Sequence, residues 1–228
     1  MDSAYSQLSA KYGDKPPDYY DCSREELIPF VADTSRRVLD VGCSSGGFGE
    51  LLKRVRPGIE VWGVEPETEV AKVAAGRLDK VINGLFSSND PALRDEKFDT
   101  ILFNDVLEHL VDPLPALKEA KALLTPSGQI IASIPNILFY YQVFQLVIRQ
   151  DWKYQESGIL DYTHLRFFTK KSILRMFDEA GLTVTRIEGI NPDSSIWWRL
   201  FNLFTLGQRR DWKFTQFATC GVLDPTRQ

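Results

Sequence analysis

Cysteine and histidine are scarce in this chain. There are three cysteines and two histidines among 228 residues, and Cys22, Cys43 and Cys220 show none of the paired spacings that zinc sites use. We therefore expect no metal. An odd number of cysteines, together with an N-terminus that lacks a basic segment followed by an apolar core, predicts a reduced, cytoplasmic protein.

An excess of positive charge is also lacking. The net charge of -4 and the pI near 5.3 indicate no basic surface for a phosphate backbone, which argues against a nucleic-acid partner. The aromatic, largely apolar stretch at residues 136–148 is too short to span a bilayer. The length and the ordinary composition predict one domain, residues 1–228.

The glycine-rich segment at residues 38–50 is the central feature of the chain. Val38, Leu39 and Val41 form an apolar run typical of a buried parallel strand, and four glycines follow within residues 42–49. Glycines tolerate positive φ and let a ligand approach the backbone closely. A helix beginning near Gly46 offers unpaired N–H groups, and Asp40 adds a carboxylate at the strand end. This pattern predicts a nucleotide-type ligand at the turn.

Strand and helix patterns alternate from this turn onward. A strand at residues 60–64 ends at Glu65, roughly twenty residues beyond the glycines, where an acid can bind ribose hydroxyls or open the next helix. A short strand follows at residues 80–82, and the strand at residues 100–103 ends in Asn104 and Asp105. The alternation predicts a Rossmann-like, doubly wound, mostly parallel α/β sheet with its ligand at the carboxyl ends of the strands.

The alternation breaks in the second half. A turn at residues 126–128 precedes a strand at 129–134, and residues 135–168 are expected to form an inserted cap that begins with the helix at 136–148. Residues 1–23 are expected to form an arm or lid, and Ser23 to cap a short helix. The aromatic helix within residues 193–210 is interpreted as a cap, a homodimer face or a peripheral membrane contact. A final strand at 213–222 is expected to form an antiparallel edge.

Three segments in order carry a family resemblance. VLDVGCSSGG, VEPE and FDTILFNDVLEHL together resemble the class I S-adenosylmethionine-dependent methyltransferases, whose sheet has seven strands with the last one antiparallel. IPN at residues 134–136 and GILDYTHLRFFTKKSI at residues 158–173 resemble methyltransferases encoded beside polysaccharide and glycosyl-transfer genes. This second resemblance implies a small-molecule, sugar or glycan acceptor that is methylated on a hydroxyl.

The resemblance also implies which residues meet S-adenosylmethionine. Glu65 would take the ribose hydroxyls and Pro66 would face the adenine. Leu85 stands where an acid often meets the adenine amino group, so that contact would be lost, replaced or moved to the backbone of Leu85 or Phe86 after Gly84. The amino-acid and sulfonium side of the cofactor would meet Asp40, Gly42, Cys43, Ser44, Gly46, Asn104, Asp105 and Val106, with Tyr20 as an additional contact.

The two histidines are the candidate bases for deprotonating the acceptor. His164 is our hypothesis, with Asp161 or Arg166 orienting it or the acceptor, and His109 is the competitor; either could instead be a structural histidine. An NAD-dependent dehydrogenase and a non-catalytic cofactor-binding partner are the alternative functions. The turn spacing is G-x-x-x-G-G, which differs from the G-x-G-x-x-G of the dehydrogenases.

Overall fold

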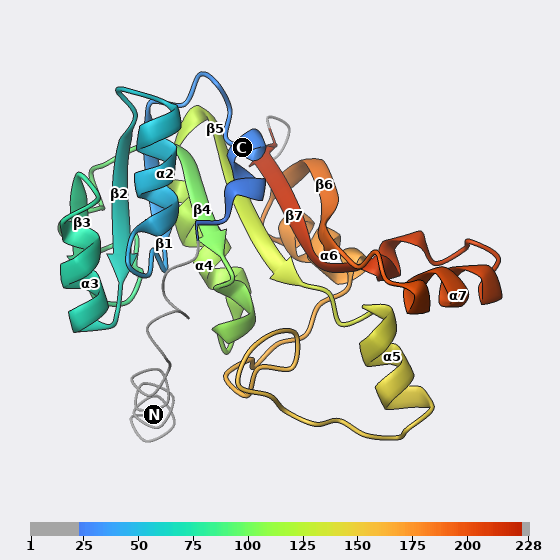
Figure 1. Ribbon diagram of the computed structural model, residues 1–228. Coiled ribbons are helices and arrows are strands. Elements are labelled where there is room, and N and C mark those ends of the chain that lie inside the picture. Colours follow the sequence, from blue (N-terminus) through green and yellow to red (C-terminus); the bar gives the residue numbers. More distant parts are fainter. Residues whose placement is uncertain (1–22, 225–228) are drawn as a thin grey trace.

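A seven-stranded mixed sheet forms the centre of the protein. The computed structural model describes residues 23–224, so Tyr20 and most of the expected N-terminal arm lie outside the described residues. The sheet order is β3-β2-β1-β4-β5-β7-β6 (Figure 1). All neighbouring pairs from β3 to β5 are parallel, and β7 is antiparallel to both β5 and β6. The strands are β1 (Arg37–Val41), β2 (Glu60–Glu65), β3 (Lys80–Asn83), β4 (Phe98–Asn104), β5 (Leu124–Pro135), β6 (Leu182–Pro192) and β7 (Phe214–Leu223).

Helices cover both faces of this sheet. The 3-10 helix η2 (Glu25–Phe30) packs with α2 (Gly47–Val55) and α3 (Thr68–Ala75) in one apolar cluster. On the other face, α4 (Pro113–Ala122) and α6 (Lys170–Glu179) pack in a second cluster. The remaining elements are η3 (Leu107–His109), α5 (Tyr140–Val147), α7 (Ile196–Phe204) and η4 (Arg210–Lys213). The expected α/β fold is confirmed.

Apolar side chains alternate between the two clusters along the strands. In β4, Ile101 and Phe103 belong to the α4 and α6 side, while Leu102 between them belongs to the α2 side. In β5, Ile130 and Ala132 again face α4 and α6. Successive side chains in a strand point to opposite faces, so a continuous apolar run is needed when both faces are covered by helices. This explains why the central strands are apolar throughout.

The C-terminal half of the sheet differs from the sequence-based expectation in two places. The final strand is antiparallel as expected, but it is not the edge: β7 lies between β5 and β6. The strand β5 begins at Leu124, so residues 126–128 belong to the strand. Its pairing with β4 shifts between Phe98 and Thr100, which indicates that the Pro-Ser-Gly segment forms an irregularity within the strand.

Two helix boundaries also differ. Residues Glu25–Phe30 form a 3-10 helix that starts after Arg24, and Ser23 does not cap it. The segment contains Pro29, which lacks an N–H group and limits a regular α-helix. The helix expected at 136–148 begins only at Tyr140, because Asn136 binds its neighbours instead: its side chain donates to Phe214 O at 3.0 Å and accepts from the Leu138 N–H at 3.1 Å.

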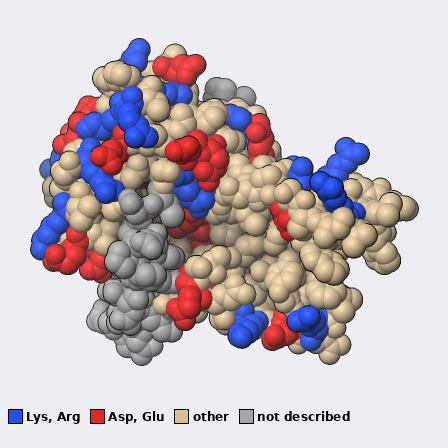
Figure 2. All heavy atoms as spheres, in the orientation of Figure 1, with Lys and Arg blue, Asp and Glu red and all other residues tan. Residues whose placement is uncertain are grey.

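The segment between β5 and α6 lies beyond the carboxyl ends of the strands (Figure 1). There α5 packs on α7, with the Tyr140 ring 5.6 Å from both Trp198 and Phe201. The other side of α7 is exposed, including Trp197 and Phe204. Charged side chains are sparse over this part of the surface and dense over α2 and α3 (Figure 2). No helix among the described residues has both the length and the apolar character needed to cross a bilayer.

Candidate active site

The glycine-rich turn between β1 and α2 has the strained backbone that the sequence predicts. Gly42 and Gly46 have positive φ values of 71° and 83°. The N–H of Gly42 donates to Val64 O at 2.8 Å, which ties the turn to β2. A Cβ on Gly42 would lie 2.6 Å from Val106 Cγ2, so this position also needs glycine for space. Val106 therefore packs directly against the turn at Gly42.

Glu65 at the end of β2 is bound to the same turn. Its two carboxylate oxygens accept from the backbone N–H groups of Ser44 and Glu67, each at 2.9 Å. Burial raises the pKa of Glu65, while these two N–H groups favour the charged form. A carboxylate oxygen has two lone pairs, so each oxygen keeps capacity for a ribose hydroxyl. Glu65 thus fixes the turn and faces the place predicted for the ribose.

Asp40 and Asn104 contribute buried polar atoms without partners. Among the described residues, Asp40 Oδ1 and both polar side-chain atoms of Asn104 make no hydrogen bond. Burial, and then the charge of Glu65, raises the pKa of Asp40 to about 8. Burial also raises the pKa of the neighbouring Cys43 thiol above its usual value, so Cys43 is a packing residue and no reactive thiolate. Unsatisfied buried polar groups are costly, so these atoms need a ligand or water as a partner.

A backbone hydrogen bond holds the segment after β3 beside Glu65. The N–H of Gly84 donates to Glu65 O at 3.0 Å. Leu85 is 59% exposed, and the Phe86 ring packs edge to face on Phe103 with centroids 5.9 Å apart. Pro66 follows β2 directly and is exposed. The resemblance assigns these four residues to the adenine, and no acid stands at residue 85.

Asp105 is held by residues that the sequence did not single out. Its Oδ1 accepts from Gln216 Nε2 at 2.5 Å and from Ser133 Oγ at 3.3 Å, and its Oδ2 pairs with the Arg24 guanidinium. The residue has a positive φ of 54°. Asp105 therefore joins the end of β4 to β5, to β7 and to the segment before η2. No local sequence signal pointed to Arg24 or Gln216, because these contacts are distant along the chain.

The two histidines lie against each other. The rings of His109 and His164 are edge to face with centroids 4.7 Å apart. Glu108 completes the group: its carboxylate is 1% exposed and lies 4.0 Å from His164 Nε2. Burial raises the pKa of Glu108 to about 8; the charge of Arg24 lowers it and that of Asp161 raises it. Sequence reasoning treated the histidines as competitors and missed Glu108, although it adjoins His109.

Asp161 and Arg166 position the loop that carries His164. Asp161 Oδ1 accepts from the N–H and the hydroxyl of Thr163 at 2.8 and 2.7 Å, forming a turn just before the histidine. The Arg166 guanidinium donates to Val111 O, with its Nε at 2.8 Å. The N–H of Arg166 donates to Glu108 O at 3.0 Å. The loop is therefore anchored on η3, which brings His164 to the end of β4.

Aromatic side chains lie on the outer side of His164. Phe167 lies 6.4 Å from the His164 ring and 5.0 Å from the Trp152 ring, measured between centroids. Tyr154 stands 6.5 Å from both Trp152 and Phe167 and is half exposed. This group of three aromatic residues offers flat apolar surfaces beside the histidines.

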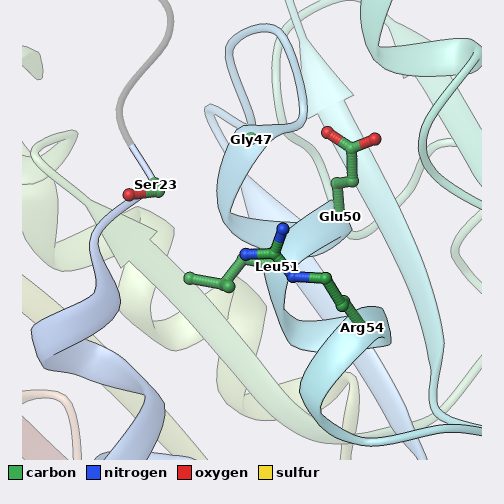
Figure 3. A pocket seen from close by; sticks show the side chains of 5 residues that line it. All are labelled: Ser23, Gly47, Glu50, Leu51 and Arg54. Atoms are coloured by element: carbon green, nitrogen blue, oxygen red, sulfur yellow. The ribbon is translucent and has the colours of Figure 1, made fainter.

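A separate shallow hollow lies on the outside of α2. Its lining includes Ser23, Gly47 and Arg54, and Figure 3 shows Glu50 and Arg54 projecting from successive turns of the helix. It contains neither the unpartnered atoms of Asp40 and Asn104 nor the histidine group. We therefore place the candidate active site at the carboxyl ends of β1, β2 and β4 and assign no role to this hollow.

Comparisons with known proteins identify the family of the chain. A sequence profile described as "Methyltransferase domain" matches residues 18–187. A ubiquinone biosynthesis O-methyltransferase of Actinobacillus pleuropneumoniae serotype 5b (strain L20) is 30% identical over 177 residues, which cover 72% of this chain and 73% of that protein.

Solved structures show the same fold. A SAM-dependent methyltransferase from Archaeoglobus fulgidus superposes with a TM-score of 0.64 at 22% identity, covering 95% of this chain and 99% of that one. The plantazolicin methyltransferase BpumL in complex with SAH has a TM-score of 0.60 at 16% identity, covering 98% and 92%.

The site fits S-adenosylmethionine by its own chemistry. Glu65 has lone pairs for the ribose, and Asp40 and Asn104 hold buried polar atoms that lack partners among the described residues. The G-x-x-x-G-G spacing and the matched family argue against the two alternative functions, an NAD-dependent dehydrogenase and a non-catalytic cofactor-binding partner. The chain therefore belongs to the methyltransferase-domain family and is an S-adenosylmethionine-dependent methyltransferase.

Proposed function

We propose that this methyltransferase transfers the methyl group to a hydroxyl oxygen of a small, flat-ringed acceptor. The group formed by Glu108, His109 and His164 is the observation that carries the proposal. It lies just after the strand end at Asn104 and Asp105, where the resemblance places the sulfonium side of the cofactor. The relatives named as O-methyltransferases support the choice of oxygen.

The chemistry requires position and the removal of one proton. Methyl transfer is an in-line displacement at a carbon already activated by positive sulfur, so the protein mainly aligns acceptor and donor. S-adenosylmethionine supplies the methyl group and leaves as a neutral sulfide. A neutral hydroxyl is a weak nucleophile and must lose its proton, which imidazole and carboxylate groups can accept. His164 stays our first candidate for this role, now with His109 and Glu108 beside it.

The aromatic residues beside His164 favour a ring-shaped acceptor. Trp152, Tyr154 and Phe167 offer faces on which an aromatic ring or the apolar face of a sugar can pack. The relatives' name concerns ubiquinone biosynthesis and mentions no sugar. We therefore place a phenolic hydroxyl first and the saccharide hydroxyl implied by the sequence resemblance second. A phenol has a pKa near 10, so its proton is removed more readily than that of an alcohol.

An acceptor panel tests this proposal. The purified protein is incubated with S-adenosylmethionine and simple catechols, phenols, saccharides or aromatic amines, and S-adenosylhomocysteine and the methylated product are identified by mass spectrometry. We expect O-methylation of a phenolic acceptor that depends on His164. Lys153→Gln serves as the control, because Lys153 is exposed on the same segment. Methylation of amines alone, with no oxygen product, would refute the proposal.

A further inference from the structure

Glu108, His109 and His164 provide three potential ligand atoms for a metal ion. One carboxylate oxygen and one nitrogen from each ring lie within 4.8 Å of one another. Zn²⁺ binds nitrogen and oxygen at about 2.0–2.2 Å, so two ligand atoms at the tetrahedral angle stand about 3.4 Å apart. His164 Nε2 and Glu108 Oε1, at 4.0 Å, would close by about 0.6 Å on binding an ion. The widest pair, at no more than 4.8 Å, would close by at most about 1.4 Å.

The Glu108 carboxylate is an independent indication of a ligand. It is 1% exposed, and neither of its oxygens makes a hydrogen bond with any described residue. A buried carboxyl group without hydrogen bonds is unfavourable, and its charged form is stable there only beside a positive charge. The nearest ring nitrogen of His164, 4.0 Å away, is too far for a hydrogen bond and would need to move by about 0.6 Å to share one cation with it.

The tautomers of the two rings also suit metal binding. His109 Nδ1 faces Thr163 O at 3.2 Å, and His164 Nδ1 faces Ile159 O at 3.0 Å. A carbonyl oxygen can only accept, so each Nδ1 carries a proton, and Nε2 is the nitrogen of each ring that would bind a metal ion. This is the arrangement by which backbone carbonyls orient metal-binding histidines.

We propose that Glu108, His109 and His164 bind one divalent metal ion of the zinc class. Two imidazole nitrogens and one carboxylate oxygen are a donor set that suits such ions. Three protein ligands leave an open coordination position. The site differs from the sequence-based expectation of no metal, because that expectation rested on the low number of histidines and their separation in the chain.

The role of the ion in catalysis rests on the proposed O-methylation. The acceptor hydroxyl occupies the open position, and the cation lowers the pKa of that hydroxyl so that its proton passes to solvent. The oxygen lone pair then forms the O–CH3 bond while the C–S bond breaks and sulfur keeps its electron pair. No oxidant or reductant is needed. The cation replaces His164 as the group that makes the hydroxyl nucleophilic.

Metal binding can be measured without cofactor or acceptor. The full chain is stripped with a chelator, dialysed and titrated with ZnCl2 by calorimetry, and Co²⁺ is used in parallel as a spectroscopic probe of coordination. We expect one Zn²⁺ per chain, with affinity reduced at least tenfold in Glu108→Gln, His109→Ala and His164→Ala. Glu179→Gln, an exposed carboxylate on α6, should bind as the wild type does.

The titration of the wild-type chain decides the proposal even if a variant fails to fold. Absence of saturable one-to-one binding would overturn it, and so would unchanged affinity in all three folded variants, since the ion would then be held elsewhere. A methylation assay with chelator separates the two proposals. Full O-methylation by metal-free enzyme overturns the catalytic role of the ion but leaves the proposed function. One-to-one Zn²⁺ binding without any O-methylation supports the site and removes the proposed function.

Discussion

His109 and His164 lie edge to face with their ring centroids 4.7 Å apart, at the end of η3 and on the loop that follows α5. Backbone bonds hold this contact, because the N–H groups of Leu165 and Arg166 both donate to Glu108 O. The two histidines are therefore parts of one site. A change in either ring, or in Glu108, is expected to affect the same chemical step.

Replacing His164 should affect turnover more than cofactor binding. We expect His164→Gln to lower kcat by about 100-fold or more, because His164 either accepts the acceptor's proton or helps to hold the ion that acidifies it, and losing a proton-transfer group typically costs 10²–10⁴-fold. The dissociation constant for S-adenosylmethionine should change less than about threefold, because the cofactor residues identified on the glycine turn and β2 are left intact. Steady-state kinetics with a methylated acceptor and calorimetry with the cofactor measure the two quantities. Unchanged turnover would contradict the assignment.

Asp40 should make the cofactor-free protein less stable as the pH rises. Its pKa in the folded protein is raised from 3.8 to about 8, so the folded state binds more protons than the unfolded state between these values. The free energy of unfolding then falls as pH rises through that window, by an amount on the order of a few kcal/mol, and levels off above pH 8.

The Asp40→Asn variant tests this pH dependence, because asparagine resembles the protonated acid. Thermal unfolding without cofactor should show the variant gaining stability over the wild type from pH 5 to pH 8.5. Asp95→Asn, at an exposed carboxylate, is the matched control and should show no such trend. Parallel pH profiles for wild type and Asp40→Asn would show that Asp40 is charged in the folded protein.

Gly42→Ala should weaken cofactor binding by tenfold or more. The new methyl group would lie 2.6 Å from Val106 Cγ2, at a backbone φ of 71° that alanine rarely adopts. Strain of this kind costs about 1–3 kcal/mol and must displace Val106 or open the turn. Gly76→Ala is the control, since it meets only an ordinary contact at 3.4 Å. Calorimetry with S-adenosylmethionine would contradict the prediction if both variants bound equally well.

The Arg24–Asp105 ion pair should contribute measurably to stability. Both side chains are partly buried, at 17% and 27% exposed, and Gln216 orders the same carboxylate. A double-mutant cycle with Arg24→Gln and Asp105→Asn should give a coupling energy of about 1 kcal/mol that decreases with salt. The exposed pair Lys72 and Glu69 should give less than about 0.5 kcal/mol. Equal coupling energies in the two pairs would show that partial burial does not strengthen the Arg24–Asp105 ion pair.

Much of the cofactor half of the fold follows from local sequence. The apolar run at Val38 to Val41, the glycines after it and the acid at the end of β2 are close in sequence, and parallel strands separated by helices bring their carboxyl ends to one edge. The prediction for Glu65 and Gly42 therefore needed no knowledge of distant contacts. The predicted start of a helix was wrong where a side chain bound backbone groups in place of the helix, as Asn136 does before α5.

The sequence by itself determined the fold class and the placement of the cofactor turn, because periodicity and turn chemistry act over a few residues. Only the tertiary structure decided that β7 lies inside the sheet and that Glu108, His109 and His164 form one group. These contacts join segments that are far apart in the chain, and their pairing depends on how helices and loops pack over the finished sheet. The spacing of two histidines in a sequence contains no information about that packing.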